Sequence, residues 1–524
     1  MALQPTCSEN FERRVERDEI VSGLQERTAY PYQFDEVEFI ETHISWVFLT
    51  DRHAYKVKKP VRFEFLDYST IEKRYQMCLD EVQLNRRLAP HVYVDVQPIT
   101  RSTQGNLHVG GDGAVVDWAV RMRRLDESTS LETMIVNQSV EGHAIKLLGD
   151  HLVTFYNRQP PVLVHTDAHR QQTEKHITAN WNELRVSDYH LNRALIDRIH
   201  QSQLQLIRVN PELLDNRVLD GRIVEGHGDL RPEHIYFTPD PVVIDCIEFN
   251  REFRTLDVFD ELNFLAMECE RLGAHEVGTG IIDAYLTASG DRPDQRLGSF
   301  YRSYRACVRA KVAVLRSRQQ SPEDAKISLE LANRYLHIAD IEAKKTNSPL
   351  MLIVSGQSGS GKTTLASELA ASLQIDHLQT DTVRSELLGE SNGDNYNQGP
   401  YSPDNRDKVY EALLSRAESK LLSGLSVVVD GTFLKEHWRG KAFEIAKLAG
   451  ARPLLIECQC PPEIAKRRIA HRLQYSESAS RAQPEFYDLQ LAAREPSAEA
   501  QPVCEVDTTT SAPLMLRKVY QTLG

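Results

Sequence analysis

The most specific chemical pattern in the sequence is a glycine-rich stretch that ends in Gly-Lys-Thr. Up to its first threonine it fits the pattern GxxxxGK[ST] without deviation, and its residues are Gly356, Gln357, Ser358, Gly359, Ser360, Gly361, Lys362, Thr363 and Thr364. In such a stretch the glycines let the backbone curl, so that successive N–H groups converge on phosphate oxygens at a helix N-terminus. Lys362 would then reach the β- and γ-phosphates of ATP as a catalytic residue, and the Thr363 hydroxyl would bind Mg²⁺.

Charged residues that would complete a phosphoryl-transfer site follow two other apolar strands. Asp430 comes after the apolar stretch 425–429, where a carboxylate beside the phosphate loop can hold Mg²⁺, although Asp-Gly is also a common turn pair. Asp381 and Arg384 form Asp-x-x-Arg after another candidate strand. The aspartate would accept the proton of an acceptor hydroxyl, and the arginine would lie near the acceptor. The same pair also suits a helix cap with an exposed arginine.

A cluster of arginines lies on a helix expected further along the chain. Arg467, Arg468 and Arg472 belong to it, and the last two are four residues apart and therefore on one helix face. Arginines that close over a nucleotide stabilise the charge of the γ-phosphoryl group. We predict that Arg468 and Arg472 contact the nucleotide; the alternative is a solvated basic face.

A second constellation of acidic residues lies in the first half of the chain. His227-Gly228-Asp229-Leu230 is followed by Val242-Val243-Ile244-Asp245. An aspartate in a tight loop can accept the proton of an attacking hydroxyl, and a second aspartate at a strand end can bind the Mg²⁺ that bridges the phosphates. Taken singly, the two motifs are a turn and a strand end. Their order and spacing favour a kinase-like origin.

The elements around these motifs predict two halves that meet near residue 348. The boundary, Thr346-Asn347-Ser348-Pro349, follows a helical stretch at 321–345 and breaks it. Before it, short strands at 37–40, 46–49, 53–58 and 115–122 precede a mostly helical segment at 127–219. After it, strands at 350–354, 425–429 and 453–458 alternate with helices at 363–373, 404–422 and 434–448, which predicts a parallel sheet covered on both faces. We expect domains at 1–347 and 348–524.

Composition narrows the class of protein. Of 524 residues, 41% are hydrophobic and 26% charged, which excludes wholesale disorder, and the apolar runs are too short to span a bilayer. The first residues lack the apolar core of a signal peptide, and eight scattered cysteines without a CxxC pair suit a reducing cytoplasm. The net charge of −13 disfavours nucleic-acid binding through overall charge, although a local basic patch could still bind it.

Residues 348–524 resemble the small P-loop kinases that include polynucleotide kinase, gluconate kinase and zeta-toxin-like kinases. The resemblance rests on the phosphate loop and on the stretches LQTDTVRSELLG and VVVDGTF. It implies an α/β P-loop kinase fold with a parallel sheet, and it puts Asp381 at the position of the acceptor base. It does not name the acceptor.

Residues 37–273 resemble the aminoglycoside phosphotransferase family, relatives of protein kinases that phosphorylate small-molecule hydroxyls. The resemblance implies an α+β, two-lobed protein-kinase-like fold. It puts Asp229 at the catalytic base and Asp245 at the metal position. Across its length, the chain resembles bacterial two-domain proteins described as aminoglycoside phosphotransferase/ATP-binding proteins.

The same resemblance implies a lysine that contacts the α- and β-phosphates and an acid that orients it. Lys56 on the third strand is the first candidate, Lys58 on the same side of that strand is the second, and Glu81 is the acid. The family pattern HGDLxxxN expects asparagine at a second metal ligand, where this chain has His234. Imidazole is a softer ligand than an amide oxygen, so either the metal site is altered or this half has lost catalysis.

Three functions are compatible with these motifs. The first is an ATP- and Mg²⁺-dependent kinase with two modules, each of which moves the γ-phosphate to a hydroxyl of a small molecule or nucleotide. The second is a nucleotide-sensing regulatory protein whose N-terminal half binds ATP without catalysis. The third is a nucleic-acid 5′-end kinase. The acceptors would be bound by segments 173–219 and 390–401, whose composition specifies neither acceptor, and the oligomeric state is not predicted.

Overall fold

The computed structural model describes residues 18–63, 66–389, 396–475, 483–499 and 501–524. They pack into two compact units: unit 1 holds the residues up to Val164 and Arg217–Asp294, and unit 2 holds His165–Asn216 and Gln295–Gly524. The predicted boundary between residues 347 and 348 does not coincide with these packing units and stays a prediction about the two modules. Part of the predicted acceptor segment 390–401, residues 390–395, lies outside the described residues.

Unit 1 is built around a six-stranded antiparallel sheet with the order β1-β2-β3-β8-β6-β7. Its strands are β1 (Glu38–Glu41), β2 (Ser45–Leu49), β3 (His53–Lys58), β8 (Ala114–Arg123), β6 (Tyr93–Arg101) and β7 (Leu107–Val109). In β3, Tyr55 and Val57 pack into the core on one face of the sheet. Because side chains alternate along a strand, Lys56 and Lys58 project to the other face, toward helix α2 (Ile71–Asn85).

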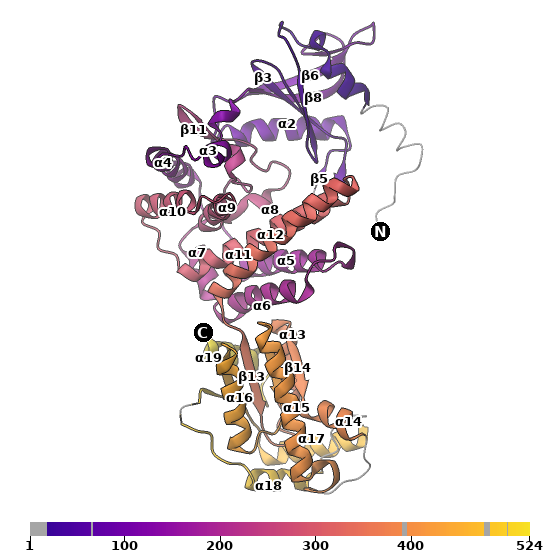
Figure 1. The fold of residues 1–524 in the computed structure, drawn as a ribbon, viewed down its shortest axis with the longest axis vertical. Helices are drawn as coiled ribbons and strands as arrows, with labels where there is room; N and C mark the ends of the chain where they lie inside the picture. The colour runs from indigo at the N-terminus through magenta and orange to yellow at the C-terminus, as the bar shows by residue number, and fades with distance from the viewer. Residues whose placement is uncertain (1–17, 64–65, 390–395, 476–482, 500) are drawn as a thin grey trace. The chain divides into compact units, whose positions relative to one another are not determined.

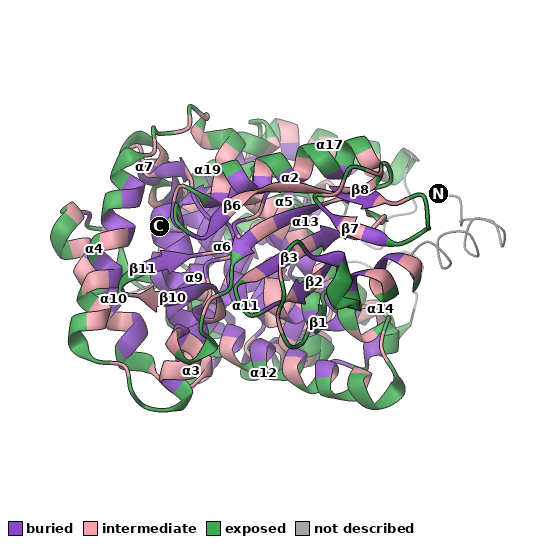
Figure 2. Cartoon of the chain, turned by 90° about the horizontal axis from the view of Figure 1, so that it is seen from above, coloured by how far each residue is buried: buried purple, intermediate pink, exposed green. Residues whose placement is uncertain are grey.

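The other elements of unit 1 are helices and short hairpins that carry the Asp229 and Asp245 loops. Helix α9 (Val258–Arg271) is buried along nearly its whole length (Figure 2), and its buried residues include the polar side chains of Asp260, Glu261, Asn263 and Glu268. It packs against α10 (His275–Ser289), which in turn packs against α4 (Gly142–Arg158). Asp229 follows strand β9 (Ile223–Glu225), and Asp245 follows β11 (Asp240–Val243).

Unit 2 contains the parallel sheet that the second half of the sequence predicts (Figure 1). Its order is β14-β15-β13-β16-β17, and its strands are β14 (Asp376–Gln379), β15 (Val427–Asp430), β13 (Leu350–Ser355), β16 (Arg452–Gln459) and β17 (Val503–Asp507). Every residue of the central strand β13 is buried, because helices cover both faces of the sheet. The α/β parallel-sheet prediction for this part of the chain is therefore confirmed.

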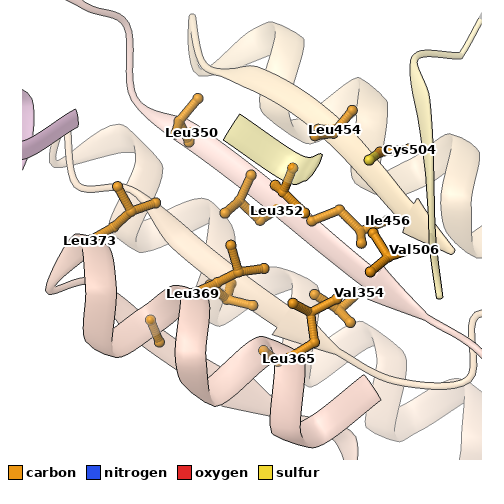
Figure 3. Packing of buried hydrophobic residues seen from close by; sticks show 14 of the residues in the cluster. Leu350, Leu352, Val354, Leu365, Leu369, Leu373, Leu454, Ile456, Cys504 and Val506 are labelled. Atoms are coloured by element: carbon orange, nitrogen blue, oxygen red, sulfur yellow. The ribbon is translucent and has the colours of Figure 1, made fainter. Parts of the chain in front are cut away.

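The two faces of the parallel sheet have separate cores. Alternate residues of β13, Leu350, Leu352 and Val354, pack with Leu365 and Leu369 of helix α13 (Figure 3). Helices α13 (Lys362–Leu373) and α19 (Ala512–Leu523) cover this face, and α15 (Pro403–Leu422) and α16 (Glu436–Leu448) cover the other. This arrangement fixes α13, and with it the phosphate loop at its N-terminus, against the carboxyl end of β13.

Unit 2 also contains four long helices, α5 (Thr166–Leu184), α6 (Arg193–Val209), α11 (Gln295–Ser317) and α12 (Pro322–Thr346). Helix α6 contacts the end of the phosphate-loop helix: His200 Nε2 lies 2.8 Å from Gln374 Oε1, and Gln201 Nε2 donates to the Gln374 carbonyl at 3.1 Å. Gln374 ends α13 in the left-handed conformation, with φ of 52°. The contacts of α6 therefore hold a backbone conformation that a glutamine rarely adopts alone.

The buried His200 makes unit 2 sensitive to acid. Its side chain stacks on Trp181, and burial lowers the pKa of His200 to about 4, although the hydrogen bond to Gln374 acts in the opposite direction. The unfolded imidazole takes up a proton near pH 6.5, so stability is lost as the pH falls from about 6.5 toward 4, by about 3 kcal/mol in all. Burial also lowers the pKa of His176, in helix α5 of the same unit, to about 4. Denaturant unfolding at several pH values should therefore show that His200→Gln removes about half of the acid dependence that these two histidines contribute. An equally steep dependence in the variant would contradict the assignment.

In the described part of the chain no helix is long and apolar enough to cross a membrane. None of the seven cysteines in these residues is in a disulfide, and all but Cys460 are buried.

Candidate functional site

The glycine-rich stretch forms a loop between β13 and α13 whose backbone only glycine suits at two points. Gly359 has φ of 78° and Gly361 has φ of 86°. A Cβ atom at Gly359 would lie 2.4 Å from the Ala465 carbonyl oxygen, and one at Gly361 would lie 3.0 Å from Thr508 Cβ. Glycine is therefore needed at both positions for this loop, the predicted phosphate cradle, to pack against Ala465 and Thr508.

We expect Gly359→Ala to damage this loop through steric conflict. The added methyl group collides with the Ala465 carbonyl and also favours negative φ, which costs about 1–3 kcal/mol of stability and at least about tenfold in ATP affinity at this site. Gly450→Ala is the matched control, because Gly450 also has positive φ, 67°, but has nothing within 4 Å of a Cβ. Thermal unfolding and ATP calorimetry check the pair. Equal ATP affinity in the two variants would contradict the cradle.

A cavity of about 280 Å³ opens above the loop. Most of the predicted nucleotide ligands line it, and its lining residues are Gly359, Gly361, Lys362, Thr363, Thr364, Arg468, Arg472, Thr508 and Met515. Arg468 is held by Thr508, whose carbonyl accepts its Nη2 at 3.0 Å. Arg472 Nε and Nη2 are buried without a hydrogen-bond partner among the described residues. Arg472 therefore keeps donors for an anion, whereas Arg468 also anchors the loop after β17.

Two residues that sequence analysis missed hold the phosphate loop from outside it. Gln490 in helix α18 (Glu485–Ala492) accepts the Ser358 amide at 2.7 Å, and its amide donates to Ser358 Oγ at 3.1 Å. The Thr508 hydroxyl donates to the Ser360 carbonyl. The threonine run at 508–510, directly after the last strand, is a sequence signal for Thr508. No local signal marks Gln490.

Asp430 ends β15 beside the loop and is 3% exposed. Its Oδ2 lies 3.5 Å from His377 Nε2, and its Oδ1 has no hydrogen-bond partner among the described residues. An unpartnered carboxylate oxygen at this burial is costly unless a cation or water meets it. With the Thr363 hydroxyl lining the cavity, the donors are hard oxygens of the kind that Mg²⁺ prefers.

The turn after Asp430 is held in a strained conformation. Phe433 is buried with φ of 42°, which is unfavourable for an aromatic residue. The Tyr410 hydroxyl accepts its amide at 2.8 Å, and Arg439 Nη1 donates to its carbonyl at 2.6 Å. Tyr410 also lies 3.2 Å from the Thr432 hydroxyl. These contacts fix the direction in which the chain leaves Asp430.

Asp381 and Arg384 lie in helix α14 (Thr380–Leu388), which starts at the carboxyl end of β14. The two side chains form an ion pair, and the Arg384 guanidinium lies 4.5 Å from the centre of the Tyr401 ring. Burial would raise the pKa of Asp381, but Arg384 and Lys362 outweigh it and hold the pKa below its usual value. Asp381 is therefore an ionised carboxylate close enough to the phosphate-loop lysine to be influenced by it.

In unit 1 the predicted lysine, acid and metal ligand come together. Lys56 Nζ lies 2.9 Å from Glu81 Oε1 and also forms an ion pair with Asp245. Burial would raise the pKa of Asp245, but Lys56 outweighs it, so the pKa lies well below its ordinary value. Lys58 is fully buried, whereas the Lys56 and Asp245 side chains retain 12% and 44% exposure. Of the two candidate lysines, Lys56 is therefore the one that a ligand can reach.

The predicted base, Asp229, is already engaged by a neighbour. Arg231 Nε donates to Asp229 Oδ2 at 3.0 Å. His234 Nδ1 donates to the Asp229 carbonyl at 2.9 Å, which leaves Nε2 as an acceptor. Arg231 Nη2 donates to this Nε2 at 3.2 Å, and Asp245 Oδ2 lies 3.6 Å from it. Burial, with Arg231 adding to it, lowers the pKa of His234, so the ring is neutral at neutral pH. His234 therefore lies between the predicted base and the predicted metal ligand.

The loop that carries Asp229 is held by Glu261 of helix α9. This fully buried carboxylate accepts the amides of His227 and Gly228, and its Oε2 accepts the Tyr156 hydroxyl at 2.7 Å. Glu261 carries no motif of its own in the sequence. The dense run of charges around it was the available signal, but only the tertiary contact distinguishes this acid from its neighbours.

Across the described ranges no group of three or more His, Cys, Asp or Glu side chains could hold a metal ion. Kinase Mg²⁺ sites use one or two protein ligands and complete the shell with phosphate oxygens and water. The residues predicted to bind metal form two sets of two ligands each: Asp430 with Thr363, and Asp245 with His234.

The parallel sheet, its strand order and the glycine-rich loop between β13 and α13 are those of the P-loop class of proteins. Residues 351–497 match the family described as AAA domain. The chain belongs to the family of "Uncharacterized protein Rv2004c" of Mycobacterium tuberculosis strain H37Rv, to which it is 31% identical over 447 residues, covering 83% of this chain and 86% of that protein. "Uncharacterized protein Mb2027c" of Mycobacterium bovis matches with the same identity and coverage.

Several solved structures are also similar to part of the chain. A putative kinase from Chloroflexus aurantiacus is 23% identical with a TM-score of 0.28 and covers 34% of this chain and 97% of its own. A gluconokinase from Sinorhizobium meliloti 1021 is 21% identical with a TM-score of 0.25, covering 34% and 93%. The Mycobacterium tuberculosis APS kinase CysC, solved with AMPPNP and APS, is 20% identical with a TM-score of 0.25, covering 34% and 98%.

Proposed function

We propose that this protein is an ATP-dependent phosphotransferase that moves the γ-phosphoryl group of ATP to a hydroxyl of a small molecule or nucleotide. The observation that carries the proposal is the arrangement at the carboxyl edge of one parallel sheet. Lys362 follows β13, Asp430 ends β15, and Asp381 follows β14. The residues proposed as phosphate loop, metal ligand and base thereby lie at one edge of the sheet, which supports phosphoryl transfer to an alcohol.

In the proposed reaction each side chain has one task. The amides of the loop and Lys362 bind the β- and γ-phosphates and balance their negative charge. Asp381 accepts the proton of the acceptor hydroxyl, whose oxygen then bonds to the γ-phosphorus as the bond to the ADP oxygen breaks. Arg472 keeps unpartnered donors for the transferred group, and Arg384 holds Asp381 ionised. Thr363 and Asp430 would hold Mg²⁺, which neutralises phosphate charge when it is bound.

For unit 1 we propose a second, aminoglycoside-phosphotransferase-like nucleotide site in a kinase-like fold. The contacts of Lys56 with Glu81 and Asp245 support it, because a lysine on strand three paired with a helix acid is how kinase-like proteins orient the α- and β-phosphates. Asp229 would be the base there, and Asp245 with His234 would hold the metal. We place the protein in the cytoplasm, where its free cysteines stay reduced.

One observation favours a sensing role for unit 1 instead of catalysis. The Asp229 carboxylate accepts a hydrogen bond from Arg231, and His234 stands where an amide oxygen would serve Mg²⁺ better. In this second candidate function, unit 1 binds ATP and only the P-loop site transfers phosphate.

A metabolite-pool screen with γ-labelled ATP tests the two candidate functions. The full-length protein, Lys362→Ala and Asp229→Ala are incubated in parallel, and labelled products are resolved. If both modules are kinases, each variant loses a different product. If unit 1 senses nucleotide, Asp229→Ala loses no product and Lys362→Ala loses all of them. Unchanged labelling in both variants would refute the proposal.

A further inference from the structure

Two lysines of strand β3 share one buried glutamate. Lys56 Nζ lies 2.9 Å from Glu81 Oε1, and Lys58 Nζ lies 2.7 Å from Glu81 Oε2. Each carboxylate oxygen of Glu81 is therefore committed to a different lysine. The Lys58 and Glu81 side chains are both fully excluded from solvent. Lys58 thus constrains Glu81 from within the solvent-excluded interior.

Lys58 has a second acidic partner, Glu248. The two side chains form an ion pair, and the Tyr68 hydroxyl donates to Glu248 Oε1 at 2.6 Å. Glu248 lies three residues after Asp245, which is the second partner of Lys56. An unbroken line of ionic contacts therefore connects strand β3, helix α2 and the segment 245–248.

The segment 245–248 needs such support, because its first residue is in an unfavourable conformation. Asp245 has φ of 65°, in the left-handed region. Tyr93 accepts the Asp245 amide at 3.0 Å, and Asn85 Oδ1 accepts the Cys246 amide at 2.8 Å. Those bonds hold the start of the segment, and the ion pair with Lys58 holds its end at Glu248. A residue in a sparsely populated conformation persists only where its surroundings determine it.

We propose that Lys58 and Glu248 are positioning residues for the nucleotide site of unit 1. They hold Glu81 and the segment 245–248 so that Lys56 and Asp245 face the phosphates and their metal ion together. The inference rests on the proposed nucleotide binding by unit 1. Removing Lys58 leaves Glu81 with a single lysine and Glu248 without one, so Glu81 turns toward the remaining cation and Lys56 loses its orientation.

The test measures binding of two ligands to full-length protein in which Lys362→Ala silences the P-loop site. The affinity for Mg²⁺·ATP depends on the groups that face the phosphates. The affinity for adenosine, which has no phosphates, depends only on the rest of the site. The variants added to this parent are Lys58→Met, Lys58→Arg and the double variant Lys58→Met/Glu248→Gln, which removes both charges and so avoids a lone buried carboxylate. Lys146→Met, at a lysine with 71% side-chain exposure, is the control.

We expect the double variant to bind Mg²⁺·ATP about tenfold more weakly than the parent, since one buried charge-assisted contact is lost. Its adenosine affinity should stay within about twofold, and Lys58→Arg should recover part of the loss. An equal fall in both affinities, as general damage to the fold would cause, overturns the inference; so does an unchanged Mg²⁺·ATP affinity. If the Lys362→Ala parent binds neither ligand, the proposed nucleotide site of unit 1 is itself refuted. This outcome is distinct from the two outcomes that overturn only the roles of Lys58 and Glu248.

Discussion

Replacing Lys362 by alanine is expected to reduce phosphoryl transfer at the P-loop site by about a thousandfold or more. Lys362 is the first residue of α13 and lines the cavity above the phosphate loop. The Lys362 ammonium group stabilises the negative charge that develops on the γ-phosphoryl group and on the leaving ADP oxygen in the transition state. Its removal is therefore expected to lower mainly kcat. The rate of product labelling from γ-labelled ATP measures it.

The contribution of unit 1 has to be removed for this comparison. We therefore expect the full effect when Lys362→Ala is compared with wild type in an Asp229→Ala background. Lys447→Ala is the matched control, because Lys447 is an exposed lysine of α16, away from the loop. Labelling within tenfold of the background protein would show that the loop does not bind the transferred phosphate.

Replacing Asp381 by asparagine is expected to lower kcat by about 100- to 10,000-fold and to change ATP affinity little. The amide keeps the size of the side chain but cannot accept the proton of the acceptor hydroxyl. Calorimetry with Mg²⁺·ATP and labelled-product rates separate the two effects. A parallel loss of ATP affinity would instead assign Asp381 to nucleotide binding.

The pH profile gives a second test of Asp381 as the base. Burial raises its pKa, and Arg384 and Lys362 lower it further than burial raises it. The carboxylate is therefore active above this lowered pKa, and activity is lost as the pH falls through it. Arg384→Met removes the largest lowering influence, so the acid limb of the profile should move to higher pH. An acid limb that stays in place would exclude Asp381 as the titrating base.

The phosphate loop and its supporting strands were predictable because their signals are local. The glycines, Lys362 and Thr363 are adjacent in sequence, and the apolar runs that became β13, β15 and β16 lie within two residues of their predicted positions. The pair Asp229–Asp245 came from the order and spacing of two motifs, and the pair Lys56–Glu81 came from a family resemblance. The structure brings Lys56, Glu81 and Asp245 into contact. Their functional roles remain predictions.

The residues that support these sites were not predictable, because their partners are distant in sequence. Gln490 reaches the Ser358 amide across 132 positions, and Glu261 reaches His227 across 34. The strained turn at Phe433 depends on Tyr410 and Arg439, whose side chains carry no signature of that task. Such contacts depend on how elements pack, which a pattern of neighbouring residue types does not encode.

The amino-acid sequence by itself determined that a phosphate-binding loop follows an apolar strand and that a parallel sheet surrounds it, because loop geometry and strand alternation are set by neighbouring residues. Only the tertiary structure decided which lysine of β3 keeps some exposure and which is fully buried, since Lys56 and Lys58 are residues of the same type on the same side of the strand. The tertiary structure also decided that the helices at 165–216 and 295–346 belong to the same unit as the P-loop sheet. The reason is that the unit to which a helix belongs depends on the distant residues against which its side chains are buried, and not on its position along the chain.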